Sequence, residues 1–419
     1  MPTPQTTELI ATALFGAAVL HTFVAKQIHG LDDRFPRHAG LFRLLGEVEV
    51  VFGFWAMVLV CALAFHAGAD TALEYAESRN FTEPLFVFVV MVIAATRPIL
   101  QAVRKGIELT AKAVPLPTHI VRAWLALAAI PVLGSFITEP AAMTIAALVL
   151  RPQIFRQEVP ERVKYFLLGV LFVNVSIGGT FTNFAAPPVL MVAATWQWST
   201  WDMATMFGWK AAIAVLFNAT AAVYVARRHL STETPQEQNG AAPVSLTVVH
   251  VLLLGLVVLL AHHPVAFLGV FLLFLGISQA YERHQDSLIV RDALLVAFFL
   301  AGLVVLGGMQ RWWLQPIITS LTPGQLFAAA TALTAITDNA ALTYLGSLVQ
   351  GLSDQAKYML VAGAVAGGGL TVIANAPNPA GVALLREGFE DESIGIPGLL
   401  AGALLPTAVA VAVFLLPHG

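Results

Sequence analysis

The sequence predicts an all-α polytopic membrane protein. Of its 419 residues, 58% are hydrophobic and only 11% are charged, whereas a soluble domain carries about 25% charged residues. Apolar runs recur from Leu9 to Leu416, each about twenty residues long, which is the length that a helix needs to cross a bilayer. A transmembrane β-barrel would instead show segments of about ten residues of alternating polarity. We therefore expect an integral membrane protein with the lipid bilayer as its partner, and neither a soluble enzyme nor a nucleic-acid-binding protein.

The apolar runs give about ten membrane crossings and two shorter hairpins. The expected crossings are residues 8–25, 46–67, 84–103, 165–197, 204–226, 246–262, 264–280, 292–308, 358–385 and 396–416. The expected hairpins are residues 119–150 and 323–350. Their legs at 139–150 and 323–336 would make helices of only about 18–21 Å. We expect both hairpins to be re-entrant, with their irregular backbone satisfied by protein or a water-filled cavity.

Positive charges predict the orientation in the membrane. Sixteen Lys and Arg residues fall in loops on one side, three fall on the other, and three lie inside or beside spans. Because cytoplasmic loops are enriched in Lys and Arg, the richer side is the inner one. Both termini are then expected outside. The single cysteine, Cys61, excludes a disulfide framework and a cysteine-based metal site.

A polar stretch near the middle, Ser231 to Ala242, divides the chain into two halves of similar size. We expect a first repeat over residues 1–230, a cytoplasmic linker over 231–245 and a second repeat over 246–419. Each repeat would hold three spans, a hairpin, a broken span and a last span, and the two would have opposite orientations. The broken spans are residues 165–197 and 358–385.

Two pairs of matching blocks support this internal repeat. Residues 137–144 (ITEPAAMT) align without a gap to 336–343 (ITDNAALT), with five identities and an acid opposite an acid. Residues 178–188 (GGTFTNFAAPP) align to 367–377 (GGGLTVIANAP). The first pair falls at the hairpin bends, and the second interrupts the span that follows each hairpin. Two matches in the same order are specific evidence for an inverted-topology repeat.

The blocks contain residues that break helices within apolar spans, because glycine weakens a helix and proline lacks a backbone donor. These candidate helix-breaking residues are Gly178, Gly179, Pro187, Pro188, Gly367, Gly368 and Pro377. Unwinding frees backbone carbonyls and amides in mid-membrane, where half-helix ends can hold ions.

The side chains of the blocks favour a cation. Glu139 and Asp338 place one carboxylate in each bend, which repels anions and suits a hard cation with oxygen ligands. A carboxylate at bilayer depth can hold either a proton or Na⁺, and this competition is the minimal device for exchanging the two. We expect Na⁺ at Glu139 and Asp338, with further ion-binding or proton-binding oxygens from Thr138, Thr337, Asn339, Thr182, Asn183, Thr371, Asn375 and Asn378.

With these motifs the chain resembles the ion transporter superfamily, which includes arsenite permeases, divalent-anion/sodium symporters and related sodium/proton antiporters. It is most similar to the antiporters, in which an Asp-Asn pair occupies the hairpin, here Asp338-Asn339. The hairpin sequences Thr138-Glu139-Pro140 and Thr337-Asp338-Asn339 depart from the Ser-Asn-Thr signature of the divalent-anion symporters.

The resemblance implies a secondary antiporter in a bacterial inner membrane that expels Na⁺, with Li⁺ and K⁺ as further candidates, in exchange for H⁺. It implies no resident cofactor, because Na⁺ and H⁺ are transported. It also implies a mobile transport domain made of the hairpins and broken spans, a homodimeric scaffold made of the other spans, and an elevator movement.

Other functions stay open on the sequence. An anion carrier, either an arsenite permease or a sodium-coupled dicarboxylate symporter, would need bound Na⁺ to offset the two acids. An intramembrane enzyme would need an acid dyad, because the sequence contains no hydrolase or nucleotide-binding motif. A channel is the third alternative, and it would conduct ions without the alternating access that inverted repeats favour.

The candidate residues also have structural interpretations. Glu139 and Asp338 could offset helix macrodipoles, the asparagines could cap helices, and the glycine pairs could permit close helix packing. Arg97 is expected either to extend towards the inner surface or to act as a counter-charge to one of the acids.

Overall fold

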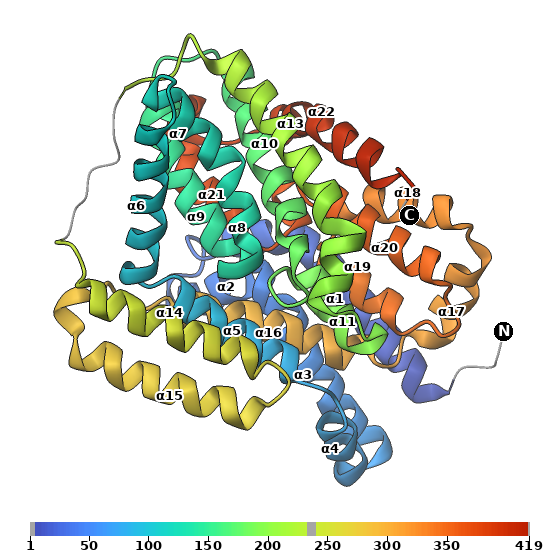
Figure 1. The fold of residues 1–419 in the computed structure, drawn as a ribbon. Coiled ribbons are helices and arrows are strands. Elements are labelled where there is room, and N and C mark those ends of the chain that lie inside the picture. Colours follow the sequence, from blue (N-terminus) through green and yellow to red (C-terminus); the bar gives the residue numbers. More distant parts are fainter. Residues whose placement is uncertain (1–4, 233–239, 418–419) are drawn as a thin grey trace. The chain divides into compact units, whose positions relative to one another are not determined.

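The computed structural model describes residues 5–232 and 240–417, and these residues form helices and no strands (Figure 1). The chain folds into two compact units. Unit 1 consists of residues 1–88, 290–322 and 344–353, and unit 2 consists of residues 89–289, 323–343 and 354–419. Each unit therefore draws on both halves of the sequence.

Unit 1 is built around three long apolar helices. Its helices are α1 (Thr6–His29), α2 (Ala39–Leu45), α3 (Val48–Ala67), α4 (Ala69–Glu77), the first part of α5 (Thr82–Ala94), α16 (Val290–Gly307), α17 (Arg311–Ser320) and the end of α19 (Asn339–Ser347). Helix α3 packs against both α1 and α16. Gly302 of α16 lies directly against the backbone of Phe52 in α3. The absence of a side chain at Gly302 allows these two helices to cross closely.

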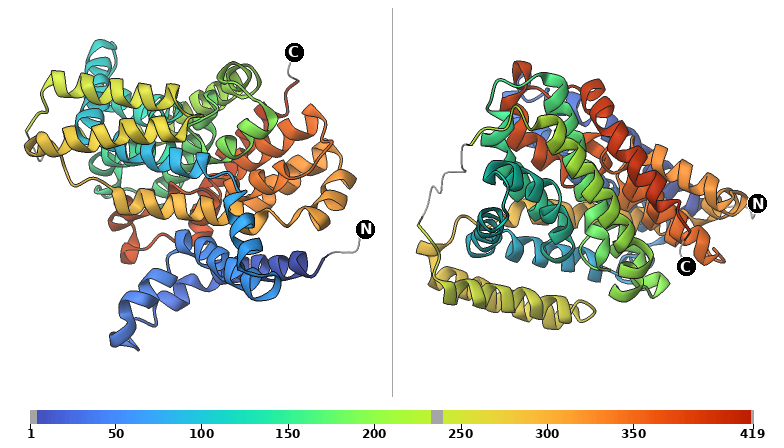
Figure 2. Two further views of the ribbon diagram at one scale, coloured as in Figure 1. Left: turned by 90° about the horizontal axis from the view of Figure 1, so that it is seen from below. Right: turned by 45° about the horizontal axis from the view of Figure 1, so that its top comes forward.

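Unit 2 contains both segments expected as hairpins and both expected broken spans, apart from the end of α19. Its first helices are α6 (Arg97–Ala113), α7 (Thr118–Leu127), α8 (Ala129–Ile137), α9 (Glu139–Leu150), α10 (Glu161–Gly178), α11 (Pro187–Trp196), α12 (Thr200–Met203) and α13 (Trp209–Ala226). The later ones are α14 (Val244–Leu259), α15 (Pro264–Ala280), α18 (Pro323–Thr334), the start of α19, α20 (Asp354–Gly367), α21 (Asn378–Leu385) and α22 (Ile396–Phe414). Helices α14 and α15 pack side by side, as the left view of Figure 2 shows.

Helix α10 is the centre of unit 2. Every residue from Leu167 to Gly178 is buried, and α10 packs against α8, α13, α20 and α22. Two glycines allow the close crossing with α22, because Gly169 lies against the backbone of Gly402, and Gly402 in turn lies against the Tyr165 carbonyl group. The buried C-terminal end of α10 is where the candidate site begins.

Among the described residues, six helices are long and apolar enough to cross a membrane, and the number rises to eight if each of two bent helix pairs is one span. The bent pairs are α5 with α6, at 65°, and α7 with α8, at 43°. The expected span at residues 84–103 therefore changes direction sharply before Arg97. Proline at the second position of α6 favours a new helix start there. The ten expected crossings stay a prediction.

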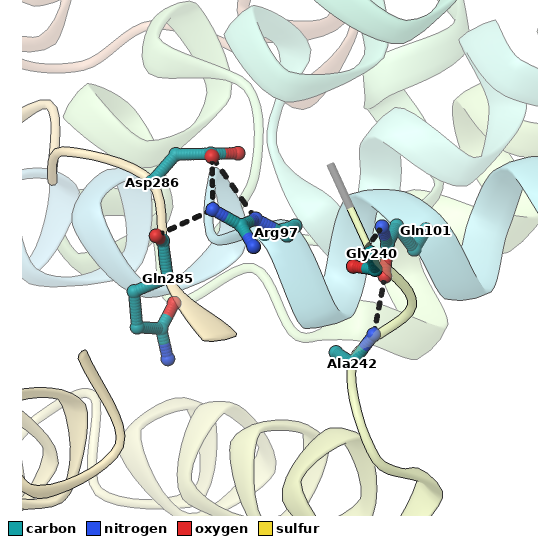
Figure 3. Close-up of polar contacts among 6 residues, drawn as sticks. All are labelled: Arg97, Gln101, Gly240, Ala242, Gln285 and Asp286. Atoms are coloured by element: carbon teal, nitrogen blue, oxygen red, sulfur yellow. Dashed lines mark hydrogen bonds and ion pairs between the residues drawn. The ribbon is translucent and has the colours of Figure 1, made fainter. Parts of the chain in front are cut away.

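Part of the expected linker, residues 233–239, lies outside the described residues. On its C-terminal side, the backbone carbonyl of Gly240 accepts a hydrogen bond from the side chain of Gln101, and the backbone N–H of Ala242 donates to that side chain (Figure 3). The same end of α6 carries Arg97, which forms an ion pair with Asp286 and donates to the Gln285 carbonyl oxygen (Figure 3). Arg97 is therefore paired outside the two acidic bends.

Candidate functional site

The first bend places Glu139 in a fully buried position of unit 2. Helix α8 ends at Ile137 and α9 begins at Glu139, and the two helices pack against each other. Thr138 connects them with φ 75° and ψ 151°, a region that is essentially restricted to glycine and costs about 1–3 kcal/mol for other residues. Strain of this kind in a β-branched residue is typical of functional sites, where the surrounding structure holds it in place.

Glu139 contacts the second half of the chain. Its side chain is 0% exposed, and its Oε2 accepts a hydrogen bond of 2.8 Å from Nδ2 of Asn375. Asn375 is 1% exposed and lies between the short 3₁₀ helix Val372–Ala374 and α21. The interruption of the α20–α21 span therefore brings an amide to a carboxylate 236 residues away.

The second bend holds Asp338 in a different way. Asp338 precedes α19, and its Oδ1 accepts hydrogen bonds from the backbone N–H groups of Ala340, at 2.8 Å, and Ala341, at 3.2 Å. This arrangement is a helix N-cap. Asp338 is only half-buried, whereas the next residue, Asn339, is 0% exposed.

The interrupted spans separate their helices by a short 3₁₀ helix, Gly179–Phe181 or Val372–Ala374, and irregular backbone. Helix α10 ends at Gly178 and α11 begins at Pro187, while α20 ends at Gly367 and α21 begins after Pro377. Pro187 and Pro188 form the first turn of α11, where a missing N–H costs no intrahelical bond.

Two threonines fasten the breaks to the helices that precede the bends. Thr182 donates a hydrogen bond of 2.7 Å to the Ser135 carbonyl oxygen, and Thr371 donates one of 2.9 Å to the Ala335 carbonyl oxygen. The two contacts are similar in the two halves of the chain. They use the threonine hydroxyl groups as structural donors, while each hydroxyl oxygen keeps the capacity to accept.

Several buried side-chain oxygens of the bends and breaks have no hydrogen-bond partner among the residues that the structure describes. They are Thr138 Oγ1, Glu139 Oε1, Asn339 Oδ1, Asn375 Oδ1 and Asn378 Oδ1. Buried polar atoms are normally paired, because an unpaired one costs about 1–3 kcal/mol. These five atoms lie in both bends and in the second break, and oxygen atoms are the ligands that hard cations take.

The remaining predicted residues have other contacts. Asn378 donates to the backbone carbonyls of Gly368 and Thr371, and Thr337 donates to the Asp338 carbonyl at 3.3 Å. Asn183 donates to the Trp198 carbonyl and accepts from the hydroxyl group of Thr200.

The chain matches the model of a protein family described as "Putative Na+/H+ antiporter" over residues 6–417. The chain belongs to this family. No curated protein matches the chain. Membership of an antiporter family, together with the long apolar helices, supports an integral membrane transporter that exchanges cations for protons, rather than an enzyme. The wider placement in the ion transporter superfamily stays a prediction.

Ser135, which contacts the first break, is a residue that the sequence reasoning missed. Its hydroxyl donates to the Gly178 carbonyl at 2.7 Å and accepts from the Phe181 N–H at 3.0 Å, so it pairs two backbone groups that the break at Gly178 sets free. A signal was present, because extending the first alignment by two residues places Ser135 opposite Thr334. The hydroxyl group of Thr334 is also fully buried.

Asn174 and Ser176 act between helices. Asn174 donates to the Leu127 carbonyl at 2.8 Å. The residue four positions later, Pro131, cannot donate to this carbonyl because proline lacks an N–H. Ser176 donates to the Val365 carbonyl of α20 at 2.8 Å. These bonds support the backbone around the site.

Proposed function

We propose that the protein is a secondary antiporter that exchanges Na⁺ for H⁺ by alternating access, with Li⁺ and K⁺ as further candidate substrates. Na⁺ and H⁺ are its substrates, and we propose no resident cofactor. Glu139 is the central binding group, and Asp338 adds negative charge from the second bend.

The observation that carries this proposal is the fully buried carboxylate of Glu139. Its Oε1 has no hydrogen-bond partner, and neither have the side-chain oxygens of the adjacent Thr138 and of Asn375, which donates to Glu139. An ionised carboxylate without a positive partner is very costly in a buried position. The four motif blocks contain no Lys or Arg, and Arg97 is paired with Asp286. Glu139 therefore needs either a proton or a cation, and the oxygens of Thr138, Asn339 and Asn375 suit the cation.

The exchange follows from this alternation. When Na⁺ binds, the O–H bond of protonated Glu139 breaks, the proton leaves to water, and the carboxylate oxygen coordinates Na⁺. On the opposite side of the membrane a proton displaces Na⁺ in the reverse step. Asp338 caps the N-terminus of α19, where its carboxylate accepts from two backbone N–H groups. Its charge supports cation binding.

The surrounding architecture is part of the proposal. We propose two inverted-topology repeats with re-entrant hairpins at residues 119–150 and 323–350, ten crossings, and both termini outside a bacterial inner membrane. The hairpins and broken spans would move as a transport domain, in an elevator movement, against a homodimeric scaffold. The glycines and threonines of the two breaks, which make similar contacts in the two halves, support the repeat.

The test is proton movement in proteoliposomes on addition of Na⁺, Li⁺ or K⁺. Wild type, Glu139→Gln and Asp338→Asn are compared, and Glu77→Gln, at an exposed position of α4, serves as the matched control. We expect cation-driven proton movement in wild type and in the control, its loss in Glu139→Gln, and a weaker apparent Na⁺ affinity in Asp338→Asn.

Size-exclusion profiles and thermal unfolding in detergent establish that each variant is folded. If folded wild type moves no protons with any of the three cations, the antiporter proposal fails. The same vesicles would then be tested with arsenite and dicarboxylates, the substrates of the alternative anion carrier.

A further inference from the structure

The backbone at Gly179 lies directly against the carboxylate of Glu139. A Cβ atom at Gly179 would come within 2.5 Å of Glu139 Oε1 and 2.9 Å of its Cγ, and within 3.1 Å of the Ala186 Cβ. These distances are shorter than van der Waals contact. Any side chain at residue 179 would therefore displace the carboxylate or the start of α11.

The two glycines of each pair have different neighbours. A Cβ at Gly178 would meet the backbone of Pro131 in α8, and one at Gly367 would meet the carbonyl oxygen of Thr331 in α18. These first glycines permit close packing of helices. A Cβ at the second glycine, Gly368, would instead overlap Ser176 Oγ and lie 2.9 Å from Asn339 Nδ2. The second glycine of each pair thus borders a polar side chain of the site.

The backbone around Gly179 is held on both sides. The Ser135 hydroxyl group bonds to the carbonyl of Gly178 and to the N–H of Phe181, and the Thr180 hydroxyl group donates to the Ile177 carbonyl at 2.7 Å. All these groups are buried or half-buried. These hydrogen bonds hold the backbone of Gly179 in place beside Glu139 Oε1.

We infer that Gly179 is a specificity-determining residue, whose backbone limits the space beside Glu139 Oε1 so that the site accepts Li⁺ and Na⁺ and disfavours the larger K⁺. This inference rests on the proposed function and names its substrate range. The size of a binding space is one of the means by which proteins discriminate among alkali cations. Gly179 has this role rather than Gly368 because its nearest neighbour is the carboxylate oxygen of Glu139, whereas Gly368 lies against the Ser176 hydroxyl group and an amide nitrogen of Asn339.

The test uses a double-mutant cycle between residues 179 and 139. Apparent KM values for Li⁺, Na⁺ and K⁺ are measured in proteoliposomes for wild type, Gly179→Ala, Glu139→Asp and the double variant. Gly269→Ala is the control, because a Cβ at Gly269 in α15 would meet nothing within 4 Å. Aspartate is one methylene shorter than glutamate and makes room for the new methyl group.

We expect Gly179→Ala to raise the Na⁺ KM by about tenfold and the Li⁺ KM by less, so that the preference shifts towards the smaller ion. The Na⁺ KM of the double variant should be about tenfold lower than the value expected if the two single effects were independent, as for residues in direct contact. Ala186→Gly, which removes the methyl group next to Gly179, should widen the space and lower the K⁺ KM relative to Na⁺.

Several results would overturn the inference. One is a wild type that exchanges K⁺ as well as Na⁺. Another is an unchanged ion preference in folded Gly179→Ala, with effects that simply add to those of Glu139→Asp. If Gly179→Ala does not fold, an unchanged preference in Ala186→Gly is decisive. A wild type without any cation-driven proton movement refutes the proposed function and this inference together, whereas an active but unselective wild type refutes the inference alone.

Discussion

The hydrogen bond between Asn375 and Glu139 provides the sharpest prediction for a single side chain. Asn375→Ala removes the donor to Glu139 Oε2 and, with it, the unpartnered oxygen Oδ1. The donor fixes one carboxylate oxygen and leaves Oε1 as the oxygen that faces Gly179. Without it, the ionised carboxylate that binds the cation is less stable, and one candidate oxygen ligand is lost.

The expected loss of Na⁺ affinity in Asn375→Ala follows from the burial of both residues and the charge of Glu139. Asn375 is 1% exposed and Glu139 is 0% exposed, so bulk water replaces neither partner readily. A hydrogen bond to a charged group contributes about 1.5–3 kcal/mol, and about 1.4 kcal/mol corresponds to a factor of ten in affinity. The apparent affinity for Na⁺ should therefore fall by about 10-fold to about 100-fold.

The assay is the Na⁺ dependence of proton movement in proteoliposomes, read with a pH-sensitive dye. Asn80→Ala is the matched control, because it also removes an amide donor to a carboxylate, that of Glu83, but at an exposed position. Its Na⁺ KM should stay within about threefold of wild type, an effect below 1 kcal/mol. An unchanged KM in folded Asn375→Ala, or an equal loss in both variants, would refute the assigned role of the Asn375–Glu139 bond.

Three further predictions concern charged residues outside the bends. Arg97→Gln removes a partly exposed ion pair with Asp286 and should cost at most about 1 kcal/mol in thermal unfolding while leaving the Na⁺ KM unchanged; a large change in KM would contradict this. Lys210→Met removes a buried ammonium group that donates to the carbonyls at the end of α22, and should lower the free energy of unfolding by about 3 kcal/mol; a loss below about 1 kcal/mol would mean that those carbonyls find other partners. Arg43 lowers the pKa of Asp32 below its ordinary value of 3.8, so this pair stabilises the fold above that pH and the stabilisation is lost as the pH falls through the lowered pKa. Arg43→Gln should therefore be less stable than wild type at neutral pH and converge with it in acid, and a constant difference in melting temperature at all pH values would argue against the pair.

Run length and composition predict helices well where an apolar segment stays straight. The expected spans at residues 46–67 and 396–416 correspond to α3 (Val48–Ala67) and α22 (Ile396–Phe414). The span at 84–103 stays a prediction, but it contains a 65° bend between α5 and α6 that apolar content does not report. The signal for that bend was the Arg97-Pro98 pair, since proline starts a helix more readily than it continues one.

The site was only partly predictable for a related reason. Matching blocks place Glu139 in a bend and Asn375 in a break. Pairing between them depends on how segments 236 residues apart pack, which the sequence does not report. The positive φ of Thr138 is equally invisible in the sequence, because it is imposed by the packing of α8 on α9 against the preference of a β-branched residue.

The two aligned acids illustrate what an internal repeat can and cannot predict. Alignment places Glu139 opposite Asp338, but Pro140 stands where the second half has Asn339, and Ala186 stands where it has Asn375. The asparagine that binds Glu139 therefore has an alanine as its counterpart in the first half, and Asp338 is held by backbone N–H groups of its own helix instead. Repetition of a pattern predicts where the two carboxylates lie along the chain. Their different partners are the reason why the proposed function gives them different roles, with the exchanged ion at the fully buried Glu139 and a supporting charge at Asp338.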